Sequence, residues 1–292
     1  MPATDPTTKA KFEQLRAEAN AGNPESQNDL GVMYMNGQGT RQDFKLADHW
    51  YRKSAEQGYA IAQNNLGAQY ANGEGVPKDF TQAAYWYRKA AEQGRAAAQY
   101  NLGELYDNGA GVPTDEREAE KWMLKAAEQG RSDAQNYLGT IYQKGKGNVP
   151  QDLKKAAEWY RKAADQGNPV AQNNLATMYV AGQGVPQSYE QAVYWSRKSA
   201  EQGNAYAQYN LGVRYMNGEG IAKDPQQAAA WFEKSANQGY PFAQLSMGVI
   251  YQKGLAGRPQ DVRLARQWFQ KAAQGGDPGA QQMAEQGLEQ LK

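Results

Sequence analysis

The chain has 292 residues and nearly balanced charge, with 32 basic and 31 acidic side chains. This balance gives no polyelectrolyte basis for binding nucleic acid or an anionic membrane, and no apolar run approaches the ~20 residues that span a bilayer. The chain contains no cysteine, which excludes disulfides and thiol chemistry. Because its first residues lack the apolar core of a signal peptide, we expect a cytoplasmic location as the sequence stands, or a periplasmic or secreted one if a signal peptide has been removed.

At the N-terminus, residues 1–22 do not form a full copy of the unit that fills the rest of the chain. Phe12, Leu15 and Ala19 recur at helical spacing among charged residues. A terminal repeat needs a polar outer face to stay soluble. We therefore predict an N-terminal capping helix here.

From residue 23 onward one unit recurs, most cleanly at 59–94. A terminal glycine closes each copy at intervals of 36 or 37 residues, and this fixed period indicates a solenoid whose units pack only against their neighbours. We predict one continuous domain with a C-terminal capping helix at 277–292. The closing glycines are Gly58, Gly94, Gly130, Gly167, Gly203, Gly239 and Gly276. The predicted repeats are 23–58, 59–94, 95–130, 131–167, 168–203, 204–239 and 240–276.

The first half of each unit predicts a helix with one apolar face, carried by Ala62, Leu66 and Tyr70 in the second unit. Asn23-Pro24, an N-cap residue followed by proline, marks its start in the first unit. The glycine after the leucine, Gly67, costs about 1 kcal/mol relative to alanine inside a helix. Close approach of a neighbouring helix is the expected compensation.

Paired glycines such as Gly73 and Gly75 follow this helix in every unit. The first suits the left-handed position that ends a helix. A phosphate-binding loop would need a preceding strand and a helix N-terminus aimed at the phosphate. Because the pair follows a helix and recurs seven times, we interpret it as a structural turn.

The second half of each unit predicts another helix, which opens on an N-cap residue such as Asp79, with Gln82 completing a capping box. Metal binding or acid catalysis is the alternative reading of this aspartate row, and its periodic capping context favours structure. Each second helix carries one tryptophan, whose burial is worth at most ~4–6 kcal/mol per repeat at ~25 cal/mol per Å². We predict that the tryptophans, rather than hydrogen bonds, hold the stack together, and that Arg88 and Lys89 are solvated near the helix end.

The pattern Ala-Gln-x-x-Leu-Gly-x-x-Tyr, then Gly-x-Gly-Val-x-x-Asp, then Ala-x-x-Trp-Tyr-x-Lys-Ala-Ala-x-Gln-Gly resembles the Sel-one-like repeat (SLR) family, which is related to the tetratricopeptide repeats. The resemblance covers about residues 23–276. It implies an all-α, right-handed α-α superhelix (solenoid) of seven helix pairs with helical caps at both ends, the first helices lining the concave side. Members of the family are adaptors, assembly factors and regulators that bind protein, and many are bacterial and exported.

Catalytic and metal-binding motifs are poorly supported by the sequence. His49 is the only histidine, at a position that varies among the units. With one histidine and no cysteine, Cys/His catalysis, a serine–histidine triad and histidine-rich metal sites lose their basis. We expect no enzyme activity, cofactor or metal, although carboxylate-only chemistry stays open.

The resemblance places two positions of each unit on the groove. The position before the leucine is rich in asparagine, whose amide can donate to and accept from a peptide backbone; bonding between neighbouring helices is the alternative. This position holds Asp29, Asn65, Asn101, Tyr137, Asn174, Asn210 and Ser246. The position five before the leucine holds Glu25, Ile61, Ala97, Asp133, Val170, Tyr206 and Phe242.

These positions differ in chemistry along the chain. Tyr206, Tyr209 and Phe242 predict an aromatic C-terminal half, with packing between repeats as the alternative. Asp29, Glu104 and Asp107 make the N-terminal half acidic. Relatives that clamp a C-terminal carboxylate use basic residues at the two groove positions, and none stands there in this chain, so a basic or apolar ligand fits better.

We therefore predict a scaffold or adaptor that binds a protein or peptide mainly through its concave groove. We expect a monomer that binds no nucleic acid and inserts into no membrane. An inhibitor or immunity protein that wraps a toxin or enzyme is one alternative. A consensus-like engineered array with no natural partner is another.

Overall fold

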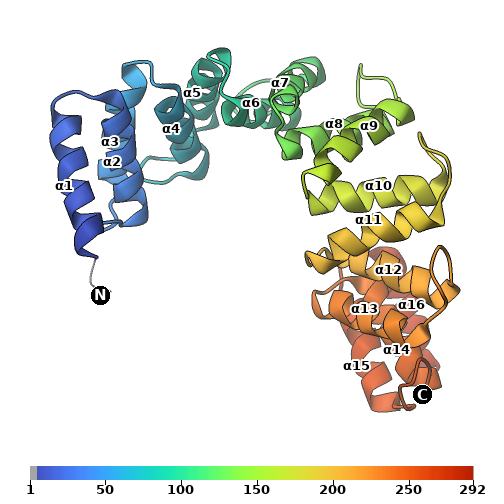
Figure 1. Ribbon diagram of the computed structural model, residues 1–292. Helices are drawn as coiled ribbons and strands as arrows, with labels where there is room; N and C mark the ends of the chain where they lie inside the picture. Colours follow the sequence, from blue (N-terminus) through green and yellow to red (C-terminus); the bar gives the residue numbers. More distant parts are fainter. Residues whose placement is uncertain (1–4, 292) are drawn as a thin grey trace. The chain divides into compact units, whose positions relative to one another are not determined.

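The computed structural model describes residues 5–291. Within them every named element is an α-helix (Figure 1), and the only ladder-type pairing is an isolated bridge between Lys146 and Val149. The helices are α1 (Pro6–Asn20), α2 (Pro24–Asn36), α3 (Phe44–Glu56), α4 (Ala60–Asn72), α5 (Phe80–Glu92), α6 (Ala96–Asn108), α7 (Glu116–Glu128), α8 (Ser132–Lys144), α9 (Leu153–Asp165), α10 (Pro169–Ala181), α11 (Tyr189–Glu201), α12 (Ala205–Asn217), α13 (Pro225–Asn237), α14 (Pro241–Lys253), α15 (Val262–Ala273) and α16 (Pro278–Glu289).

These helices form an all-α solenoid, as predicted. Helices α1 and α16 stand where the capping helices were expected, and the pairs α2–α3 to α14–α15 lie between them. The chain divides into two compact units, each described separately below. The N-terminal unit reaches Leu138 and includes Gly145–Pro150; the C-terminal unit comprises Gly139–Lys144 and continues from Gln151. Consecutive helices pack together from α1 to α7 and from α9 to α16.

The glycine pairs shape the turn between the helices of a repeat, as the sequence predicted. Gly73 ends α4 with φ 76°, a left-handed conformation that glycine adopts without steric cost. Gly75 also has a positive φ, and a Cβ there would lie 2.3 Å from the carbonyl oxygen of Phe44 in the preceding repeat. The second glycine therefore lets consecutive repeats approach backbone to backbone.

The predicted aspartate caps are confirmed, but the capping box is only half formed. The Asp79 side chain accepts hydrogen bonds from the backbone N–H groups of Thr81 and Gln82 at 2.9 and 3.1 Å. In a full capping box the Asp79 N–H would donate to the Gln82 side chain. Here it donates to the carbonyl of Tyr70 instead, at 2.9 Å. The cap thus ties the second helix to the end of the first one.

Close helix approach explains the glycine after the leucine. A Cβ on Gly67 would lie 2.7 Å from Cδ1 of Tyr87, which packs flat on the glycine from the second helix of the same repeat. The fifth repeat carries Ala176 at the glycine position, and there the tyrosine position is Ser196. Both residues line one small cavity, so the shorter serine leaves room for the alanine methyl.

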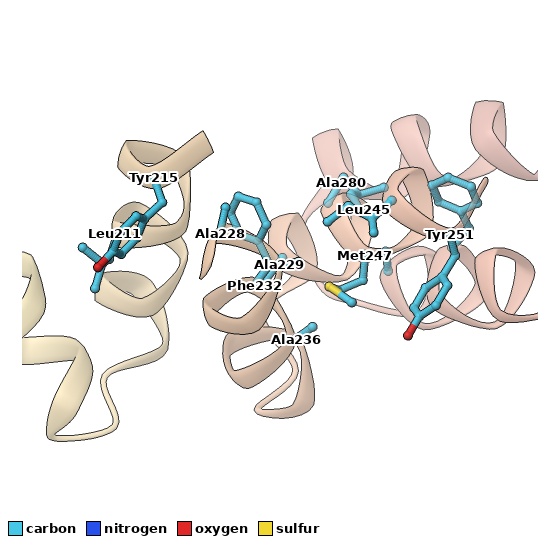
Figure 2. Packing of buried hydrophobic residues seen from close by; sticks show 14 of the residues in the cluster. Leu211, Tyr215, Ala228, Ala229, Phe232, Ala236, Leu245, Met247, Tyr251 and Ala280 are labelled. Atoms are coloured by element: carbon cyan, nitrogen blue, oxygen red, sulfur yellow. The ribbon is translucent and has the colours of Figure 1, made fainter. Parts of the chain in front are cut away.

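Tryptophans lie at the boundaries between repeats. Trp86 packs against Ala47, Tyr51 and Ala55 of the preceding repeat, and the tryptophans of the first five repeats are buried. Trp231 and Trp268 are only partly buried, so the predicted stripe weakens toward the C-terminus. Figure 2 shows the core there, built on Leu211, Phe232, Met247 and their neighbours.

Hydrogen bonds also cross the repeat boundaries, which the sequence analysis missed. Gln93 donates to Gly58 O of the preceding repeat at 3.0 Å and to Gln63 Oε1 at 2.8 Å. Gln63 in turn donates to Ala55 O at 3.1 Å. The buried Gln63 amide is costly to leave unpaired, so these glutamine bonds help to fix the register between consecutive repeats.

The arginine near the end of the second helix is bonded rather than simply solvated, contrary to our prediction, whereas Lys89 is exposed. The Arg88 guanidinium donates to the hydroxyl of Tyr106 in the next repeat, and Arg52 does the same to Tyr70 at 2.9 Å. Lys89 lies 5.5 Å from the centre of the Trp86 ring, where a cation is attracted to the π face. These side chains therefore link repeats and cover tryptophan.

Candidate functional site

A largely apolar depression lies in the C-terminal unit. It encloses about 370 Å³ between α12, α13, α14 and α16. Three of its apolar side chains are exposed, with fractions of 37 % for Val249, 43 % for Leu255 and 56 % for Met283. We call this depression the C-terminal groove. Its walls include Tyr209, Met216, Phe242, Val249, Leu255 and Met283.

Helix α14 supplies one wall because Phe242, Ser246 and Val249 follow each other at spacings of four and three residues, on one helical face. The only polar side chain of this stripe is turned back on its own helix, since the Ser246 hydroxyl donates to Phe242 O at 2.9 Å. The wall therefore presents an apolar surface throughout.

A departure from the repeat supplies the far end of the groove. In the seventh repeat the glycine pair is spaced by two residues instead of one, and Leu255 and Ala256 stand between Gly254 and Gly257. Ala256 has φ 55°, a left-handed conformation that a non-glycine residue adopts at a cost. Leu255 N–H donates to Ile250 O at 3.0 Å, and its side chain lines the groove.

Beside the groove lies an aromatic cluster formed by Tyr206, Tyr209, Tyr240 and Phe242. The ring centroids are 4.9 Å apart for Tyr206–Tyr240, 5.1 Å for Tyr209–Tyr240 and 5.9 Å for Tyr240–Phe242. Burial raises the pKa of the Tyr209 hydroxyl. Burial is also the main cause of the raised pKa of Tyr240. Tyr206 is 60 % exposed, so one edge of the cluster faces solvent.

The structure thus brings together the three aromatic residues that the sequence singled out. Tyr240 connects them, and the sequence analysis missed it because it precedes α14, outside the two groove positions. Tyr206 and Tyr240 belong to successive repeats, so the cluster also serves the packing between repeats that was kept as the alternative.

The asparagine row forms contacts between repeats. Asn65 Nδ2 donates to Asn28 Oδ1 of the preceding repeat at 2.9 Å. Asn101 and Asn210 make the equivalent bonds to the preceding asparagines at 3.1 and 3.0 Å, and Asn174 is not free of polar contacts either. Asn65 is half-buried, and no described group donates to its Oδ1, so the acceptor side stays available to a ligand.

The predicted acidic residues lie on first helices of the N-terminal unit, and each has a partner. Asp107 accepts from the Tyr137 hydroxyl at 2.6 Å and pairs with Lys146. Burial, followed by this hydrogen bond, raises the pKa of Tyr137. Glu104 accepts from the Tyr100 hydroxyl at 2.9 Å.

Three first helices of the N-terminal unit together carry acidic side chains and no basic ones. Helices α2, α4 and α6 contain four acidic residues and no lysine or arginine: Glu25, Asp29, Glu104 and Asp107. Asp29 accepts from Asn28 Nδ2 at 3.1 Å. Asn101 and Glu104 line a second, more polar depression of about 580 Å³.

His49 packs edge-on against Trp50, with ring centroids 5.2 Å apart. Among residues 5–291 no three or more histidine, aspartate or glutamate side chains gather as metal ligands. In the same part of the chain, no helix is both long and apolar enough to cross a bilayer.

Seven consecutive stretches of the chain match the Sel1 repeat, at residues 24–59, 60–94, 96–130, 132–168, 169–204, 205–240 and 241–277. The chain belongs to the Sel1 repeat family. Each matched stretch contains one of the helix pairs described above, from α2–α3 to α14–α15. The SLR resemblance drawn from the sequence is therefore confirmed.

Solved structures agree with this assignment. A protective antigen present in uropathogenic Escherichia coli strains, which displays an SLR fold, is 35 % identical with a TM-score of 0.80; the match covers 96 % of this chain and 70 % of that one. A Sel1 repeat protein from Oxalobacter formigenes is 38 % identical with a TM-score of 0.67, over 73 % of this chain and 85 % of that one. An immunity protein from Pseudomonas aeruginosa is 22 % identical with a TM-score of 0.43; the match covers 80 % of this chain and 81 % of that one. This likeness is too distant to bear on function. Comparison with curated proteins gives no match.

Proposed function

We propose that this Sel1 repeat protein is a scaffold or adaptor that binds a partner protein, with the C-terminal groove as its main binding surface. Sel1 repeats are typical of protein-interaction scaffolds and are generally non-enzymatic. The observation that carries the proposal is the exposure of Val249, Leu255 and Met283 around one depression. Contiguous apolar patches on a monomer mark interaction sites, and aromatic side chains supply much of the energy at such sites.

Outside the groove, the residues chosen from the sequence form two further contact surfaces in this proposal. The aromatic cluster extends the groove and adds Tyr206, Tyr209 and Phe242. The half-buried amides and the acidic face of the N-terminal unit would favour a basic segment of the partner. These residues are Asn65, Asn101, Asn174, Asn210, Tyr137, Asp29, Glu104 and Asp107. We further propose that the free protein is a monomer.

Site-specific photo-cross-linking tests the main surface. A benzophenone amino acid replaces Met283 in the groove or, as a matched control, Val262, which is 45 % exposed at the start of α15. Irradiation in the source cell followed by mass spectrometry should yield one dominant protein from the Met283 position and not from the Val262 position. Equal cross-linking from both positions, or none from Met283, would refute the groove as the main binding surface.

A further inference from the structure

We infer that the C-terminal groove receives an amphipathic α-helix whose apolar stripe fills the groove and whose acidic flank pairs with Lys253. This inference rests on the proposed binding function and names the chemistry of the partner. Three features of the groove support it: the hydrogen-bonding groups that it lacks, the flexibility of its walls, and the charge beside it.

The groove offers little to the backbone of an extended peptide. The Ser246 hydroxyl is bonded within α14, and the amide donor of Asn210, next to Tyr209 on α12, is bonded to Asn173. An extended segment buried here would leave its own N–H and C=O groups unpaired, which is costly. A helix pairs these groups internally and can turn an entirely apolar stripe toward the groove.

The walls suit side chains that enter from a helix. Met216 and Met283 stand on two different walls, and the unbranched, polarisable thioether side chain adapts to irregular apolar partners. Phe242 and Tyr209 add flat aromatic surface. We expect apolar anchors at positions i, i+3 or i+4, and i+7 of the partner, the spacing that places them on one helical face.

The charge on the first helices of the C-terminal unit selects the polar flank. Helices α10, α12 and α14 contain no aspartate or glutamate. Their two basic residues differ, because Arg214 pairs with Glu219, whereas Lys253 is exposed and makes no ion pair within residues 5–291. Lys253 lies four residues after Val249, so it prolongs the apolar stripe of α14.

The opposite wall does not cancel this charge. On α16 the stripe through Met283 continues with Gln286 and Gln290, which are uncharged, whereas Glu285 and Glu289 fall on other faces of the helix. A negative residue on the partner therefore meets an unpaired cation at the rim and no nearby acid on the same stripe. Such complementarity favours an acidic helix over a basic one.

Selection from a random peptide library displayed on phage tests the inference with defined probes. The full chain is the target, and the double variant Met283→Glu with Leu255→Glu serves for counter-selection. Enriched peptides should carry the i, i+3 or i+4, i+7 apolar spacing with aspartate or glutamate beside it. As synthetic peptides they should gain helical circular dichroism on binding. The double variant should bind them at least about 30-fold more weakly, the effect of losing a hot-spot contact, and Val262→Glu should bind them unchanged.

A charge exchange separates the flank from the apolar stripe. Lys253→Glu should weaken binding of the acidic peptide and restore binding of its Glu→Lys counterpart. Groove-dependent peptides that are rich in proline or lysine would overturn the helix inference and leave the proposed binding function standing. A concentration-dependent dimer abolished by Met283→Glu would assign the groove to a second copy, which also overturns it. Failure to enrich any groove-dependent peptide would count against both proposals.

Discussion

The contact between Gly67 and Tyr87 gives the sharpest test of how the repeat is packed. In Gly67→Ala the new methyl carbon would lie 2.7 and 2.8 Å from two ring carbons of Tyr87. The ring is 5 % exposed, so it has little room to move. Overpacking of this kind costs roughly 1–3 kcal/mol, while alanine gains about 1 kcal/mol of helix propensity over glycine. We expect a net loss of about 0–2 kcal/mol in the free energy of unfolding.

The fifth repeat supplies the matched background for this test. Where the ring is replaced by serine, as in Tyr87→Ser, the methyl of Gly67→Ala has space and only the propensity gain of about 1 kcal/mol remains. The two substitutions should therefore couple by about 1–3 kcal/mol in a double-mutant cycle, which is the overpacking cost itself. Ala176→Gly should instead lower the free energy of unfolding by about 1 kcal/mol, because Ser196 does not clash with the Ala176 methyl and glycine has the lower helix propensity. Urea unfolding followed by circular dichroism measures all four variants.

Refutation would come from a Gly67→Ala variant that is more stable than the parent. Additive effects of Gly67→Ala and Tyr87→Ser would also refute the steric account, because the methyl and the ring would then not meet. Either result would leave the recurring glycine without the packing role described here.

Three further predictions concern other features of the fold. Gln93→Leu should lower the free energy of unfolding by about 1–3 kcal/mol in a urea titration because it leaves Gln63 Oε1 unpaired, whereas Glu92→Leu, at an exposed neighbouring position, should change it by less than about 0.5 kcal/mol. Burial raises the pKa of Tyr87 from its ordinary 10.0 to about 12. The unfolded chain loses this proton first, so the contribution of Tyr87 to stability should be constant below about pH 10 and should fall as the pH rises toward 12. A pH titration of the free energy of unfolding should show that Tyr87→Phe removes this part of the fall. Sedimentation of the free chain should give a monomer at all concentrations, and a Met283-dependent dimer would contradict this.

Features repeated in every unit were readable from the sequence because their causes are local. The caps at Asp79 and its counterparts, the left-handed Gly73 and the closely approached Gly67 each follow from residue type within one helix or turn. Seven copies of the same pattern separated these structural roles from catalytic ones. The all-α solenoid and its family followed from the same regularity.

Contacts between repeats were harder to predict because they join residues far apart in sequence. The bond from Gln93 to Gly58 O joins residues 35 positions apart, and the Arg88–Tyr106 bond joins residues 18 apart. Residue type alone does not choose these partners over solvent. For the asparagine row the sequence left two roles open, ligand binding and bonding between neighbouring helices, and the structure shows Asn65 and Asn101 bonded to the preceding repeat.

The candidate site was predicted in part. Tyr206 and Phe242 were found because they occupy a repeat position that faces the groove in related folds, and Tyr209 because it stands next to Asn210 at the other such position. Leu255 and Met283 were missed because they lie outside the repeat pattern, in an altered turn and in the capping helix. The exposed apolar surface arises at these exceptions, where the regular packing between repeats ends.

Binding of the cross-linked partner, once purified, to groove variants measures the central claim most directly. Isothermal titration would compare the parent chain with the double variant Met283→Glu and Leu255→Glu, and with Val262→Glu as the control of equal charge type on the same unit. The proposed function predicts that the double variant raises Kd at least about 30-fold while its melting temperature and the affinity of the control stay unchanged. An unaltered Kd in a folded double variant would contradict the assignment of the C-terminal groove as the binding surface.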